Sequence, residues 1–156
     1  MAVTAVLAFW HEQVLSTAPV DKATAETAVE GLYRLIDHPA PRIVWLMVPA
    51  GEATETNIAA LAGKLAAGDL VIDGGNSNYL DSIRHGEELL AKGIHFVDCG
   101  TSGGVWGLDN GYALMVGGTD ESVAIAQPIF DALSPDQGFA HAGPVGGGPS
   151  VEVRLL

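Results

Sequence analysis

The chain has 156 residues, 48% of them hydrophobic and 17% charged, which suits one domain with an apolar core and is short for two. Nineteen acidic and seven basic residues give a net charge of −12, so we expect neither nucleic acid nor an anionic membrane as a partner. A single cysteine excludes an intrachain disulfide framework and a cysteine-based metal cluster, and no apolar run approaches the roughly 18 residues of a membrane span, which together predict a soluble, cytoplasmic protein.

Strand-like and helix-like segments alternate along the chain. The start of the chain is ambiguous, although the first ten residues could form a strand. Residues 42–48 form an apolar run typical of a strand that is buried on both faces. The other expected segments, in chain order, are a helix over 25–36, a helix over 52–66, a strand over 70–72, a helix over 78–92, a strand over 94–98, a loop over 100–111, a strand over 112–116, a helix over 119–133 kinked or split at Pro128, and a short strand over 139–142.

This alternation predicts parallel βαβ units and therefore an α/β fold. We expect an incomplete, Rossmann-like, doubly wound and mostly parallel sheet with flanking helices. Ligands of such sheets bind at the carboxyl ends of the strands, so the turns that follow the strands are the candidate site.

Three turns after predicted strands are rich in small residues. Residues 48–51 would let a flat ring approach the backbone, although a plain strand-to-helix turn explains them equally well. Residues 73–77 contain two glycines and Asn76, whose amide can donate and accept hydrogen bonds; the alternative is that Asn76 or one of its two successors only caps the next helix. Residues 100–107 can present several backbone N–H groups to an anion, or form a mobile glycine-rich loop.

The ordered series GGNS, TSGG and LMVGG carries a resemblance to a known family. From about Arg42 to Pro144 the sequence resembles 6-phosphogluconate dehydrogenase, and TSGGVWGL resembles the shorter, bacterial form. The resemblance implies oxidative decarboxylation of 6-phosphogluconate, a phosphorylated sugar acid, to ribulose 5-phosphate. It implies NAD or NADP as cofactor, with NAD favoured for the short form, and no metal.

The resemblance also implies site residues. The cofactor would contact Val48, Pro49, Ala50 and Asn76, and the substrate would contact Asn76, Ser102, Gly103 and Gly104.

Both ends of the chain depart from the family's pattern. Residues 1–41 lack the G-x-G-x-x-G turn that holds the pyrophosphate, because no glycine precedes Gly31. The family-like part covers residues 42–144, and the tail over 145–156 diverges from the family's pattern. In the family, the segment at this place carries a lysine base and a glutamate acid, as the resemblance implies. No catalytic residue is therefore expected, nor the all-helical substrate and dimer domain, and we expect the isolated chain to be inactive.

Two alternatives remain open: a β-hydroxyacid dehydrogenase acting on an unphosphorylated acid, and a non-catalytic remnant that binds a ligand or associates with a partner, with homo-oligomers possible in either case. Four residues have simpler interpretations. Cys99 is expected to be a small residue that fills space in the core, Trp45 to be a core residue, and His141 to have a structural role. For Trp106, packing and lining the site are equally favoured.

Overall fold

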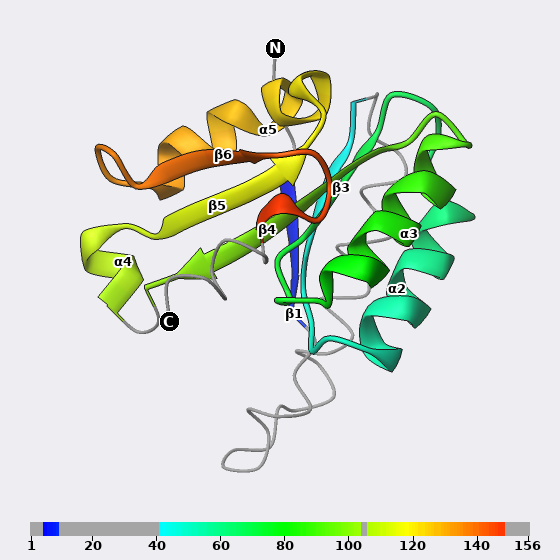
Figure 1. Cartoon of the computed structure of the whole chain (residues 1–156), viewed down its shortest axis with the longest axis horizontal. Coiled ribbons are helices and arrows are strands. Elements are labelled where there is room, and N and C mark those ends of the chain that lie inside the picture. Colours follow the sequence, from blue (N-terminus) through cyan, green and yellow to red (C-terminus); the bar gives the residue numbers. More distant parts are fainter. Residues whose placement is uncertain (1–4, 10–40, 104–105, 149–156) are drawn as a thin grey trace.

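A six-stranded sheet, with its strands side by side in chain order, forms the centre of the computed structural model, which describes residues 5–9, 41–103 and 106–148 (Figure 1). The elements are β1 Ala5–Phe9, β2 Ile43–Met47, α2 Glu52–Ala62, β3 Leu70–Asp73, α3 Tyr79–Leu90, β4 His95–Ser102, α4 Gly107–Asn110, β5 Ala113–Gly118, α5 Asp120–Leu133 and β6 Phe139–Gly143. Within the described residues, no helix has the length and apolar character needed to cross a bilayer.

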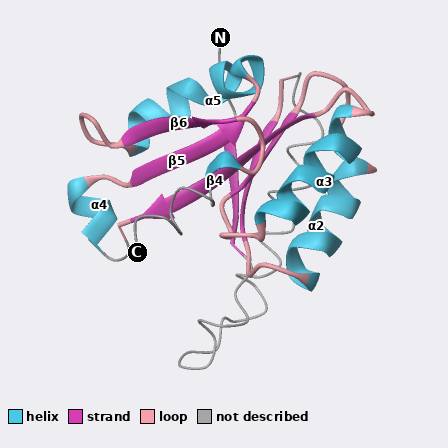
Figure 2. Cartoon of the chain, in the orientation of Figure 1, coloured by secondary structure: helices cyan, strands magenta, loops and turns pink. Residues whose placement is uncertain are grey.

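The direction of the strands decides which face each helix covers. Strands β1 to β4 are parallel neighbours, β5 runs antiparallel to β4, and β6 is parallel to β5. Crossovers between parallel strands are right-handed, so reversing the strand direction at β5 moves the next crossover helix to the opposite face. Helices α2 and α3 accordingly lie on one face and α5 on the other (Figure 2), which confirms the predicted doubly wound, mostly parallel α/β sheet.

Each face of the sheet has its own apolar core. On β2, Ile43 and Trp45 pack towards α5, whereas Val44 and Leu46 pack towards α2 and α3. Alternation along a strand buried on both faces produces this division. Trp45 meets the ring of Phe130 edge-on with centroids 5.8 Å apart, so its predicted core role is confirmed.

Several predicted boundaries differ from the structure; the helix expected over 52–66, for example, ends at Ala62. Residues 100–102, expected in a loop, continue β4 because their backbone pairs with β5 as far as Ser102. The loop expected over 100–111 also contains α4. Helix α5 is not split at Pro128 but continues through it, because packing of Val123 and Phe130 against the sheet holds both sides of the proline; a kink there stays a prediction.

The structure describes only part of the segment over 1–41. Strand β1 confirms the expected strand within the first ten residues. The helix expected over 25–36 lies outside the described residues.

Candidate functional site

The candidate turns follow three neighbouring parallel strands. Because β2, β3 and β4 point the same way, residues 48–51, residues 73–77 and Ser102 lie at the same edge of the sheet. We call this edge the carboxyl rim. Sequence reasoning predicted that the turns of Asn76 and Ser102 would converge into one pocket at one edge of the sheet. The strand directions place both at the same edge, and their convergence into a pocket stays a prediction.

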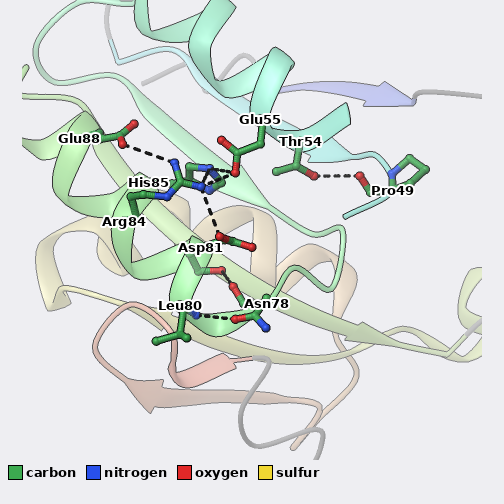
Figure 3. Close-up of polar contacts among 10 residues, drawn as sticks. Pro49, Thr54, Glu55, Asn78, Leu80, Asp81, Arg84, His85 and Glu88 are labelled. Atoms are coloured by element: carbon green, nitrogen blue, oxygen red, sulfur yellow. Dashed lines mark hydrogen bonds and ion pairs between the residues drawn. The ribbon is translucent and has the colours of Figure 1, made fainter. Parts of the chain in front are cut away.

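The first turn is tied to the helix that follows it. Val48 is buried, Pro49 is half-buried and Ala50 is exposed, so only the last of the three predicted cofactor contacts is fully open to solvent. Gly51 has φ +95°, a conformation that favours glycine. The hydroxyl of buried Thr54 donates to the carbonyl of Pro49 at 3.0 Å and so ties the turn to α2 (Figure 3).

Replacing Thr54 with valine tests this anchor. The substitution keeps the shape of the side chain and removes the donor, and we expect the free energy of unfolding to fall by about 1–2 kcal/mol because the Pro49 carbonyl loses its partner. Chemical denaturation measures the change. Thr56→Val on the exposed side of the same helix is the matched control; equal effects of the two substitutions would show that the anchor contributes nothing.

The second turn presents Asn76 to solvent. Asn76 adopts φ +54° and is exposed, and no group within the described ranges forms a hydrogen bond with its amide. The cap of α3 is Asn78, whose side chain accepts the N–H of Leu80 at 2.9 Å. The capping explanation therefore applies to Asn78, and the amide of Asn76 remains available to a ligand.

Two glycines bring the second turn against the first. A Cβ on Gly75 would overlap the carbonyl oxygen of Val48, so the two turns are in backbone contact. A Cβ on Gly74 would overlap the indole nitrogen of Trp45 and lie 2.5 Å from the sulfur of Met47. Only residues without a side chain allow this approach.

Buried polar atoms without hydrogen-bond partners lie in and beside the second turn. Among the described residues they include Oδ2 of Asp73 and the hydroxyl of Ser77, whereas Oδ1 of Asp73 accepts the N–H of Gly75 at 3.0 Å. Unsatisfied buried groups are rare in folded proteins and mark places where water or a ligand completes the network.

The third segment ends β4. Ser102 is exposed and pairs with Ala113, and the exposed Gly103 has φ +142°. Gly104 lies outside the described residues. Trp106 is 71% exposed, so it does not belong to either core of the described residues.

Helices α2 and α3 are joined by a charge network beside the first two turns (Figure 3). Glu55 of α2 contacts both Arg84 and His85 of α3, and its distance to Nε2 of buried His85 is 2.9 Å. The hydrogen bond from Arg84 lowers the pKa of Glu55 below its ordinary value, against the effect of burial. Because Arg84 and Glu55 are both more than a third exposed, water screens the pair and its contribution to stability is small.

Two further predictions concern single residues. Cys99 is fully buried within the core on the α5 face, as predicted. His141 lies on β6, where its Nε2 is 2.9 Å from the carbonyl oxygen of Gly118, which agrees with a structural role.

Sequence reasoning did not single out Asp98. It is fully buried on β4 and accepts two backbone N–H groups from a distant segment. The available signal was a charged residue inside the apolar run IHFVDCG.

A cavity of about 350 Å³ borders the third turn through Gly107, and the predicted binding residues that the structure describes do not line it. Its lining residues are Gly107, Asn110, Gly111, Tyr112, Ala132, Leu133, Ser134 and Pro135.

Comparison with known proteins gives one family and a consistent set of relatives. A family model described as the NAD binding domain of 6-phosphogluconate dehydrogenase matches residues 7–143. An NAD(+)-dependent, decarboxylating 6-phosphogluconate dehydrogenase of Haloferax volcanii is 38% identical over 91% of the chain, and an NADP(+)-dependent one of Bacillus subtilis is 34% identical over 91%. The chain spans 46% and 31% of these relatives' lengths.

Solved structures agree on the fold. The 6-phosphogluconate dehydrogenase of Plasmodium falciparum is similar with a TM-score of 0.72 at 27% identity, over 92% of this chain and 32% of that one. A 3-hydroxyisobutyrate dehydrogenase of Mycobacterium tuberculosis has a TM-score of 0.74 over 99% of this chain and 59% of that one; at 21% identity, this second likeness shows the fold alone.

Proposed function

Because the chain belongs to the family of the NAD binding domain of 6-phosphogluconate dehydrogenase, we propose that its carboxyl rim binds a nicotinamide dinucleotide together with a phosphorylated sugar acid. The observation that carries the proposal is the position of GGNS directly after β3 and of TSGG at the end of the neighbouring parallel strand β4, at the edge where such sheets bind their ligands. The reaction of the complete site would be that of a decarboxylating 6-phosphogluconate dehydrogenase.

The first two turns are suited to the nicotinamide end of the cofactor. The exposed amide of Asn76 offers a donor and an acceptor, which matches the carboxamide of the ring. Half-buried Pro49 and exposed Ala50 would supply an apolar surface beside it, whereas the side chain of Val48 is buried. A bound nicotinamide ring would supply the acceptor for the hydride from the substrate's hydroxyl-bearing carbon. The sequence offers no comparable match for the pyrophosphate, because no glycine precedes Gly31.

The end of β4 is suited to the sugar acid. Ser102 offers an exposed hydroxyl, and the glycine backbone from Gly103 to Gly104 can approach a carboxylate closely. Asn76, one strand away, would contact the substrate as well as the cofactor and so hold the reacting carbon near the ring.

The described lysines lie at the wrong edge to act as the base. Lys64 follows α2 and Lys92 follows α3, so both lie near the amino ends of β3 and β4, opposite the carboxyl rim. Losing a general base costs about 10²–10⁴-fold in rate. We therefore expect the 156-residue chain to form no measurable NADH or NADPH with 6-phosphogluconate, and a turnover of about 1 s⁻¹ or more would contradict this expectation.

Binding is measured separately from turnover. Titrating the labelled chain with NAD, NADP and 6-phosphogluconate, followed by NMR, should shift the amide signals of Asn76 with all three ligands and those of Ser102 with the sugar acid. Asn76→Ala should weaken cofactor and substrate by about tenfold each, and Ser102→Ala the substrate alone, because each removes one hydrogen-bonding group.

Asn57→Ala is the control, since Asn57 lies on α2 and donates to the carbonyl of Ala53. The same titration with an unphosphorylated hydroxy acid tests the alternative substrate class. Stronger binding of that acid would favour a different β-hydroxyacid dehydrogenase, and unchanged binding in Asn76→Ala would contradict the proposed site.

A further inference from the structure

Asp98 lies at the centre of a set of contacts that the proposed function does not use. It is fully buried in the middle of β4, where its register partners are Asp73 on β3 and Gly117 on β5. Its side chain points to the face that α3 covers, because its neighbour Val97 belongs to the core on the opposite face.

Both carboxylate oxygens accept backbone N–H groups from one short segment. Gly146 donates to Oδ1 at 2.5 Å and Gly148 donates to Oδ2 at 2.9 Å. Two charge-assisted hydrogen bonds from residues 48 and 50 positions away fix this segment to the middle of the sheet.

The surrounding glycines are required by the same carboxylate. A Cβ on Gly117 would lie 2.6 Å from Oδ1 of Asp98, and a Cβ on Gly148 would lie 2.5 Å from the carbonyl oxygen of Met115 and 2.7 Å from Oδ2. Gly146 has φ +90°, and a Cβ there would lie 3.0 Å from the side chain of Ile83 on α3. The segment is therefore held between α3, β4 and β5, with no room for side chains.

The position of this segment connects it with the carboxyl rim. Met115, which touches Gly148, pairs with Gly100, two residues before Ser102. We propose that Asp98 is a positioning residue: its carboxylate clamps Gly146–Gly148 against β4 and β5, beside the part of β4 that leads to Ser102 at the carboxyl rim. The clamp itself does not depend on the proposed function. Its relevance to substrate binding does, because Ser102 is a substrate contact only under that proposal.

The clamp should respond to pH. Burial, with a smaller contribution from nearby Asp73, raises the pKa of Asp98 to about 6, although the N–H groups of Gly146 and Gly148 lower it. On α3, buried His85 packs against Phe96 of β4, and residues 113–118 and 144–148 contain no titratable side chain. A proton on either oxygen removes one acceptor, so the clamp should loosen below about pH 6.

Backbone amide NMR of the full chain tests the clamp without any ligand. In the unmodified chain, the amide signals of Gly146 and Gly148 should titrate together with a midpoint near 6. In Asp98→Asn, which offers one acceptor oxygen and an NH₂ group, that titration should disappear, and exchange of both amide hydrogens should accelerate by roughly tenfold or more.

Asp81→Asn, on the exposed surface of α3, is the control and should change neither readout. The proposal is overturned if the two glycine signals do not titrate in the unmodified chain, or if their titration persists in Asp98→Asn. If Asp98→Asn does not fold, the titration of the Gly146 and Gly148 signals in the unmodified chain still tests the proposal. Failure of 6-phosphogluconate to bind would contradict the proposed function and leave the clamp intact.

Discussion

Replacing Asp69 with alanine is expected to lower the free energy of unfolding by about 3–5 kcal/mol, because it removes the carboxylate that pairs with a buried guanidinium. Asp69 is fully buried and Arg42 nearly so. The carboxylate accepts the Nε of Arg42 at 2.9 Å and its Nη2 at 2.5 Å. It also accepts the backbone N–H groups of Arg42 at 2.8 Å and of Ala66 at 2.7 Å. These contacts join the start of β2 to the residue before β3.

Chemical denaturation measures the effect, and Asp81→Ala is the matched control. Asp81 pairs with Arg84 at 3.3 Å on the surface, where such pairs contribute at most about 1 kcal/mol. A loss below about 1 kcal/mol for Asp69→Ala would show that the buried pair contributes little to stability.

The same carboxylate predicts acid sensitivity. Burial on its own would raise the pKa of Asp69, but the hydrogen bonds from Arg42 and Ala66 outweigh it and hold the pKa below the ordinary value of 3.8. A carboxyl group with a lowered pKa stabilises the fold above that ordinary value, and this contribution is lost as the pH falls through the native pKa. Unfolding of the parent chain should therefore become easier below pH 3.8, and Asp69→Asn should reduce that dependence.

Much of the fold follows from local sequence. The apolar run RIVWLMV predicted β2, and alternate residues of that run supply both cores. The direction of β5 could not be predicted in the same way, because a short apolar strand has the same composition whether it runs parallel or antiparallel to its neighbour. That direction extends β4 to Ser102 and places α5 on the opposite face.

The same distinction between local and distant information applies to the candidate site. The turns of Asn76 and Ser102 were found from glycines and polar residues adjacent in the chain. Asp98 was missed because its partners are 48 and 50 residues away, and its clamp exists only once β4, β5 and the glycine segment are together. Contacts between distant segments depend on tertiary packing, which local propensity does not report.

The contact between the first two turns gives the second large prediction. Gly75→Ala places a methyl group against the carbonyl oxygen of Val48, and that neighbour is backbone, which cannot rotate away as a side chain would. We expect a loss of about 2–3 kcal/mol in the free energy of unfolding, because overpacking forces the two turns apart. Denaturant titration measures this loss.

Gly63→Ala is the matched control, since its nearest neighbour, the carbonyl oxygen of Ala60, would lie at an ordinary 3.6 Å from the new methyl group. Equal stability of the two variants would mean that the turns separate without strain.

Ligand binding provides a second readout of the same substitution. If the cofactor lies against Val48–Ala50 while Asn76 holds its carboxamide, then separating the turns must misplace one contact relative to the other. Gly75→Ala should therefore weaken NAD binding under conditions in which the variant is still folded, whereas Gly63→Ala should not. A folded Gly75→Ala variant that binds NAD as well as the parent would show that the cofactor does not bridge the two turns, even if Asn76 alone contacts it.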